Sequence, residues 1–240
     1  MRFWYQKPLG RSLLKAERAG LDKILPRLFG YYLLQIGDTL DSDLLSSSPI
    51  HTKIILDQEQ PQPARVNSNF IQANYTELPF LPESIDAAIY FHILEFSSNP
   101  LELLLETYKT IIPGGYVIVF GFNPHSLWQL SRICISEAKP PWNGQFISPW
   151  KMRRLLTKSG FHAGDYETFF FRPPIENEQS LKKFLFLESL GQICWPYFGA
   201  SYMFLAQKRV AEPTLLKMKK LERNLQVVTS IPKPTSRNQT

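Results

Sequence analysis

Hydrophobic residues in this chain gather in short, nearly uncharged runs, separated by segments with helical spacing. Such runs are typical of strands buried on both faces of a parallel sheet. Because segments able to form helices lie between several of these runs, we expect a doubly wound α/β fold with right-handed crossovers. The first five predicted strands are residues 31–36, 52–56, 70–73, 87–91 and 116–122.

The clearest strand–helix–strand unit covers residues 87–122. Asn99 is placed to cap a helix and Pro100 to occupy its first turn, where the missing N–H costs nothing. Pro113, Gly114 and Gly115 then stop the helix and turn the chain into the next strand. Spacings of three and four predict that the buried face of this helix carries Leu101, Leu104, Leu105, Tyr108 and Ile112.

The rest of the chain predicts flanking elements around this unit. An amphipathic helix at 11–25 ends at Pro26, and we expect it to cover one face of the sheet. A second helix begins after the cap residue Ser148. Two more strands and a helical insertion between them are predicted at residues 167–171, 201–206 and 175–190.

Three regions follow from this reading: a helical lead-in at 1–30, one α/β domain at 31–210 and a tail at 211–240. The tail contains a basic amphipathic segment and ends in sequence rich in Pro, Ser, Thr and Lys. We expect the tail to be partly disordered. The predicted domain has a size that suits a single α/β core.

Composition and charge limit the functional classes. The chain has 44% hydrophobic residues and a formal net charge of +6, part of which lies in the tail, so the charge alone is only a general argument for a nucleic-acid partner. Cys134 and Cys194 form no metal-binding or disulfide pattern, so we expect no metal and a reduced, cytoplasmic setting. Residues 184–206 have the length of a membrane span, but two glycines and a proline interrupt them, and we expect no span.

Several residues in the central unit carry a resemblance to a known family. Leu78-Pro79-Phe80, then Asp86 at the start of a strand, then Pro113-Gly114-Gly115 before the next strand occur in this order and at these gaps. This pattern resembles the class I S-adenosylmethionine-dependent methyltransferases of type 11. The resemblance implies a seven-stranded mixed sheet in the order 3-2-1-4-5-7-6 with the last strand antiparallel.

The resemblance also implies a cofactor site for S-adenosylmethionine. Asp57 ends the second predicted strand, twenty positions after Gly37, where a carboxylate can accept both ribose hydroxyls. Asn74 stands where the family contacts the adenine amino group, and Tyr75 beside it is placed to lie on the adenine face. The bend at Phe91 corresponds to the part that lines the methionine half of the cofactor.

One segment departs from the family pattern. The turn after the first strand keeps Gly37, but the next two glycine positions hold Thr39 and Asp41, and Gln35 replaces the usual acidic residue. A residue with a Cβ does not adopt a positive φ without strain, so this turn must differ from that of the family. An alternative therefore stays open, in which the domain no longer binds cofactor and serves as a non-catalytic binding module.

Candidate acceptor-side residues follow the fourth and fifth strands. His92 and Glu95 lie after the fourth strand, at the edge where open α/β sheets bind ligands, and a histidine there can take a proton from an acceptor. Asn123 and His125 follow the fifth strand. An ordinary hydrogen-bonded loop histidine explains His92 equally well.

The function that these observations favour is methyl transfer from S-adenosylmethionine to an acceptor that the sequence does not identify. The chain lacks a phosphate-loop motif, an HExxH motif and a Gly-x-Ser-x-Gly elbow. It also lacks an Asn-Pro-Pro-Tyr string after the fourth strand, which argues against methylation of a base amino group. An RNA-associated protein that uses its basic tail is the other alternative.

Overall fold

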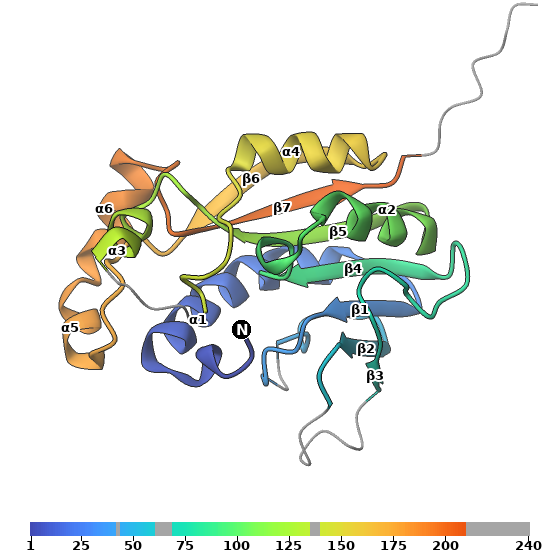
Figure 1. Ribbon diagram of the computed structural model, residues 1–240, viewed down its shortest axis with the longest axis horizontal. Helices are drawn as coiled ribbons and strands as arrows, with labels where there is room; N and C mark the ends of the chain where they lie inside the picture. Colours follow the sequence, from blue (N-terminus) through green and yellow to red (C-terminus); the bar gives the residue numbers. More distant parts are fainter. Residues whose placement is uncertain (42–43, 61–68, 135–139, 210–240) are drawn as a thin grey trace, which may run out of the picture. The chain divides into compact units, whose positions relative to one another are not determined.

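The computed structural model describes residues 1–41, 44–60, 69–134 and 140–209. Within them, seven strands form one sheet in the order β3-β2-β1-β4-β5-β7-β6 (Figure 1). Only β7 runs antiparallel to its neighbours. The predicted fold is therefore confirmed. The strands are β1 Tyr32–Ile36, β2 Thr52–Asp57, β3 Phe70–Gln72, β4 Ile85–Phe91, β5 Ile111–Phe122, β6 His162–Phe169 and β7 Ser201–Gln207.

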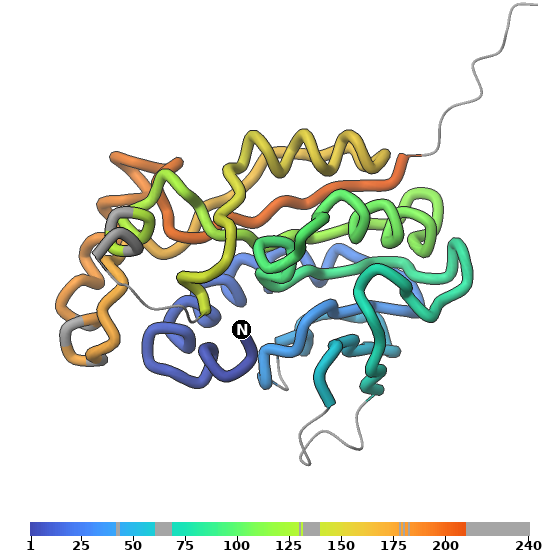
Figure 2. Tube along the Cα trace, viewed as in Figure 1, coloured from blue at the N-terminus to red at the C-terminus, as the bar shows by residue number. Residues whose placement is uncertain are grey.

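Helices cover both faces of this sheet. The chain trace in Figure 2 passes from α1 (Pro8–Ile24) into the strands and later forms α2 (Pro100–Thr110) and α4 (Pro149–Lys158). Helix α1 lies on one face, and α2 and α4 lie on the other (Figure 1). Three helices gather near the end of the sheet where β5 stops: α3 Leu127–Cys134, α5 Glu178–Lys183 and α6 Phe186–Cys194.

Successive side chains of a strand point to opposite faces of the sheet. Because helices cover both faces, the central strands are buried on both sides. Ala87, Ile89 and Phe91 belong to the core cluster that includes α1, whereas Ala88 and Tyr90 belong to the cluster that includes α2 and α4. This alternation explains why the strand is uncharged from residue 87 onward: both of its faces are covered.

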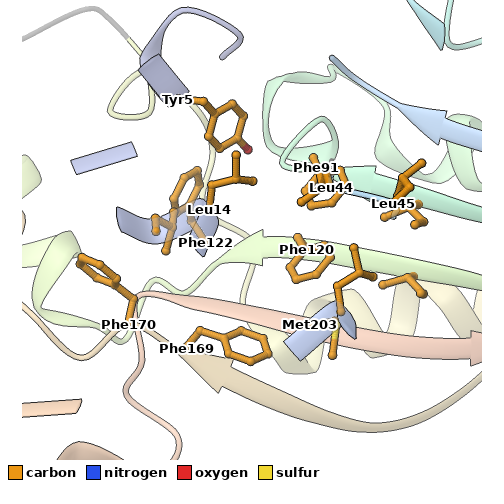
Figure 3. Packing of buried hydrophobic residues seen from close by; sticks show 14 of the residues in the cluster. Tyr5, Leu14, Leu44, Leu45, Phe91, Phe120, Phe122, Phe169, Phe170 and Met203 are labelled. Carbon is orange, nitrogen blue, oxygen red and sulfur yellow. The ribbon is translucent and has the colours of Figure 1, made fainter. Parts of the chain in front are cut away.

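Aromatic side chains fill much of the α1 side of the core. The rings of Phe91 and Phe120 stack with their centroids 4.8 Å apart, and Phe169 lies next to Phe120 (Figure 3). Leu13 and Leu21 of α1 are fully buried in the same cluster. Helix α1 therefore shares one core with the sheet.

The buried face of α2 differs from the prediction. Leu104 is buried as expected, but Leu105 is 41% exposed, and Leu103 and Thr107 are buried in its place. Thr107 tolerates this position because its hydroxyl donates to the Leu103 carbonyl and also bonds the hydroxyl of Tyr90. The apolar spacing therefore predicted the buried face only in part, because it does not register a polar residue that hydrogen bonds hold in the core.

Three further boundaries differ from the sequence prediction. Strand β5 begins at Ile111 and continues through the predicted Pro-Gly-Gly turn, where Gly114 has a φ of +84°. Strand β6 begins five residues earlier than predicted, at His162, because it is an edge strand with many exposed side chains and lacks an apolar run. The insertion forms two short helices, α5 and α6, where one was expected.

No helix in the described part of the chain is long and apolar enough to cross a membrane. Residues 184–206 contribute α6 and then β7. The predictions for the tail at 211–240 lie outside the described residues.

Candidate functional site

A polar pocket opens at the carboxyl ends of β1, β2 and β4, the edge at which open α/β sheets bind ligands. Its volume is about 370 Å³. The lining comes from the start of the chain, from the ends of these three strands and the turns after them, from the turn after β3, and from the loop before α2 and the first turn of α2. The five residues that the resemblance assigns to the cofactor all line this pocket: Gly37, Asp57, Asn74, Tyr75 and Phe91.

The turn after β1 forms although two of the three glycines of the family pattern are absent. Gly37 has a φ of +91°, and a Cβ on it would lie 2.6 Å from Cδ1 of Ile93, so glycine is needed there. Leu40 takes a second positive φ, +60°, and its N–H donates to Oδ1 of Asp38 at 2.8 Å. The side-chain amide of Gln35 donates to the Gly37 carbonyl. Side-chain hydrogen bonds therefore shape a turn that glycines shape in the resembled family.

Asp57 lies at the end of β2 and is 7% exposed. Its Oδ2 accepts a hydrogen bond from the backbone N–H of Asp38 at 2.8 Å. Its Oδ1 accepts hydrogen bonds from the hydroxyl of Tyr75 at 2.9 Å and from the N–H of Glu59 at 3.2 Å. Burial and the negative charge of Asp57 raise the pKa of Tyr75, so the phenol stays protonated and donates.

Arg2 completes this group, and the sequence analysis did not include it. Its guanidinium is 6% exposed and reaches three carboxylates: Asp57 at 3.2 Å, Asp38 at 3.5 Å and Glu59 at 3.6 Å. Nη1 also donates to the carbonyl of Gln60 at 2.7 Å. The only signal in the sequence was indirect: three acidic residues at the ends of neighbouring strands need a cation nearby.

Asn74 and Phe91 meet the pocket in different ways. Asn74 is exposed, and its Oδ1 accepts hydrogen bonds from the side chain of Gln58 and the N–H of Thr76. Phe91 is 1% exposed because its ring stacks on Phe120 in the core. The pocket at Phe91 is thus shaped mainly by backbone.

His92 and Glu95 lie in the core and do not line the pocket. Both side chains have no exposed surface. Nε2 of His92 lies 2.7 Å from Oε1 of Glu17 on α1, and Nδ1 lies 3.4 Å from Oε1 of Glu95. The structure thus places two of the three expected catalytic residues, His92 and Glu95, in a buried ionic cluster that does not line the polar pocket.

This cluster connects four elements of the fold. Burial alone disfavours the charged imidazole, but the charges and hydrogen bonds of Glu17 and Glu95 outweigh it and raise the pKa of His92 to about 9. Oε1 of Glu95 accepts the N–H of Phe122 at 2.6 Å, and Oε1 of Glu17 accepts the hydroxyl of Ser201. The cluster therefore connects α1 with the ends of β4 and β5 and the start of β7.

Asn123 and His125 lie at the end of β5, beside a second, apolar pocket of about 590 Å³. The Asn123 side chain donates to the carbonyls of Tyr197 and Gly199 and accepts the N–H of His125, so it holds the walls of this pocket. His125 is exposed and lines the apolar pocket. The two pockets share no lining residue. Other residues that line the apolar pocket include Leu127, Phe171, Leu187, Trp195 and Phe198.

Comparison with known proteins points to one family. Residues 44–119 match the family model described as "Methyltransferase domain", of type 11. The uncharacterized protein YafS of Escherichia coli K12 is 25% identical over 217 residues, which are 90% of this chain and 84% of YafS. The biotin biosynthesis bifunctional protein BioHC of Teredinibacter turnerae is 34% identical over 100 residues, which are 42% of this chain and only 18% of BioHC.

A solved structure shares the fold. A methyltransferase from Thermotoga maritima, described as a possible histamine N-methyltransferase, superposes with a TM-score of 0.59 at 17% identity. The superposition covers 86% of this chain and 93% of that one. At this identity the likeness shows the fold.

Proposed function

We propose that this chain, which contains a class I S-adenosylmethionine-dependent methyltransferase domain of type 11, binds S-adenosylmethionine in the polar pocket and transfers its methyl group to an acceptor. One observation carries the proposal. Gly37, Asp57, Asn74, Tyr75 and Phe91 come from the ends of four different strands or the turns that follow them, and all of them line a single pocket at the carboxyl edge of the sheet.

The residues of the pocket fit the cofactor. A volume of about 370 Å³ lies within the range of small-molecule sites, and Gly37 keeps the backbone after β1 close to it. Asp57 would hold the ribose hydroxyls, whereas Asn74 and Tyr75 would hold the adenine. The backbone at Phe91 would border the methionine half. The oxygens of Asp57 already accept hydrogen bonds from Asp38, Glu59 and Tyr75, so ribose would have to exchange with a group that now contacts Asp57.

The cofactor supplies a methyl group on a sulfonium, which is already activated for displacement. The main task of the protein is then to align the acceptor and exclude water. Asn123 and His125 remain our candidates for the acceptor side, since His125 is exposed beside a pocket. His92 and Glu95 would support the site by fixing the end of β4 rather than by touching an acceptor.

One observation favours a second candidate function. Because Arg2, Asp38, Glu59 and Tyr75 already engage Asp57, a domain that has lost cofactor binding and contacts a partner instead would show the same contacts. This alternative predicts that the polar pocket does not bind a nucleoside.

Calorimetric titration of the purified chain with S-adenosylmethionine and with S-adenosylhomocysteine tests the proposal. We expect saturable binding of both, with adenosine monophosphate as the control that lacks the methionine half. If neither cofactor form gives heat or a thermal shift at millimolar concentration, the binding-module alternative replaces the enzyme.

A further inference from the structure

The carboxylate expected to bind ribose is already occupied by the chain itself. A carboxylate offers about four acceptor positions. Three of those on Asp57 receive hydrogen bonds from Asp38, Glu59 and Tyr75. The guanidinium of Arg2 lies 3.2 Å from Oδ2 and covers the remaining position. A ribose diol therefore reaches Asp57 only by exchange with one of these groups.

Arg2 is the group with the weakest geometry. Its Nη2 contacts Asp57 as an ion pair, but neither Nη2 nor Nε has a hydrogen-bond partner among the described residues, although both are buried. Its one hydrogen bond runs from Nη1 to Gln60. The other three groups donate directed hydrogen bonds of 2.8, 2.9 and 3.2 Å to Asp57, whereas Arg2 contacts it without hydrogen-bond geometry, so Arg2 is the partner that leaves Asp57 most easily.

The chain around Arg2 allows this movement. Trp4 and Tyr5 are buried and anchor the segment in the aromatic core, while Phe3 is 64% exposed. A Cβ on Gly10 would lie 2.3 Å from the carbonyl oxygen of Trp4, which shows how closely the segment packs on α1. The carbonyl of Met1 accepts the N–H of Trp4 at 2.9 Å, so the backbone on both sides of Arg2 is held and only the Arg2 side chain has to turn out of the pocket while α1 stays in place.

We propose that Arg2 occupies the ribose subsite of the polar pocket and that the cofactor binds by displacing it from Asp57. This inference rests on the proposed function. It assigns Arg2 a specific role as a positioning residue: it holds Asp57, Asp38 and Glu59 together in the free protein and lowers the affinity for any ligand with a ribose diol. The pocket is thus closed by its own chain until a ligand competes.

The variant Arg2→Met tests this exchange, with Arg153→Met as the matched control. Arg153 on α4 also pairs with a carboxylate, Asp165 at 3.5 Å, but does not line the polar pocket. We expect Arg2→Met to bind S-adenosylhomocysteine about tenfold more tightly than the wild type, the equivalent of one hydrogen bond to a charged group. Arg153→Met should bind like the wild type.

A neutral pair of probes separates exchange from a simple change of charge. Adenosine carries the ribose diol and no charge, and 2′,3′-dideoxyadenosine lacks the diol. The gain in Arg2→Met should appear with adenosine and be absent with dideoxyadenosine. If Arg2→Met binds both probes more tightly by the same factor, the gain in affinity does not depend on the ribose diol, and the proposed exchange is wrong.

A second variant guards against misfolding of Arg2→Met. Glu59 is 67% exposed and holds Arg2 from outside, so Glu59→Gln should loosen Arg2 and tighten S-adenosylhomocysteine binding about twofold to threefold. If the wild type binds and neither variant binds more tightly, the exchange is wrong and the proposed function stands. If neither wild type nor variants bind, both fall.

Discussion

Two buried ionic clusters in this protein have similar composition and different surroundings. The core cluster consists of Glu17, His92 and Glu95, and all three side chains have no exposed surface. The pocket cluster consists of Arg2 with Asp38, Asp57 and Glu59, and it lines a cavity. Both contain one cation and an excess of carboxylates.

The difference lies in what each cluster is attached to. The core cluster connects α1 to the strand ends through short contacts, and neither the polar pocket nor the apolar pocket includes any of its three residues. The pocket cluster depends on one long side chain near the start of the chain and includes a carboxylate that is largely in solvent. We infer that the core cluster serves stability and that the pocket cluster serves binding.

The largest effect is expected from breaking the core cluster. Glu17→Ala removes the acceptor of two buried donors, Nε2 of His92 and the hydroxyl of Ser201, and leaving such a group unsatisfied costs about 1–3 kcal/mol each, more for the charged imidazole. Urea denaturation measures the change in the free energy of unfolding. Glu106→Ala, which breaks the surface pair with Lys109, is the control and should cost less than about 1 kcal/mol. Similar losses in both variants would contradict a structural role for the core cluster.

A dependence of stability on pH should come from the same cluster. The pKa of His92 is raised to about 9 in the folded protein from about 6.5 when unfolded, so the folded state binds the extra proton. Its contribution is complete below about pH 6.5 and is lost as the pH rises through about 9, a fall of up to about 3 kcal/mol. Denaturation of His92→Gln over the same range should show a flatter profile; an unchanged profile would assign the dependence to other groups.

A smaller effect is expected in the turn that borders the pocket. Gly37→Ala suffers both a positive φ and a contact with Ile93, whereas Gly114→Ala has a similar φ and open space around its Cβ. Thermal unfolding should show a loss of about 1 kcal/mol for Gly114→Ala and about 2–3 kcal/mol for Gly37→Ala. Equal losses of stability in the two variants would mean that Ile93 moves aside for the added Cβ, and the close contact between Gly37 and Ile93 would then not be what requires glycine.

The sequence predicted the sheet well because its central strands are covered on both faces, so that burial appears directly as uncharged runs. It did not predict the limits of β6, which is an exposed edge strand, or the face of α2, where Thr107 is buried through hydrogen bonds to Tyr90 and Leu103. Local spacing does not record such tertiary hydrogen bonds.

The site was predictable where it follows directly from strand ends. Asp57 and Gly37 lie on turns whose position the strand pattern fixes, and both line the pocket. Arg2 and Asp57 are 55 positions apart in the sequence, and no local pattern reveals a contact over that separation. The sequence predicted His92 as an acceptor-side base because it did not show that Glu17 of α1 contacts the imidazole in the core.

The most direct test of the account is calorimetric titration of wild type, Asp57→Asn and Asp57→Ala with S-adenosylhomocysteine, with circular dichroism to verify folding. Hydrogen bonds to a charged group contribute roughly 1.5–3 kcal/mol each, and losses are smaller than the sum, so Asp57→Ala should bind about 10–100-fold more weakly. Asp57→Asn should lose less, since its amide oxygen still accepts. If folded Asp57→Ala binds as tightly as the wild type, the polar pocket does not hold ribose through Asp57, and the central claim is wrong.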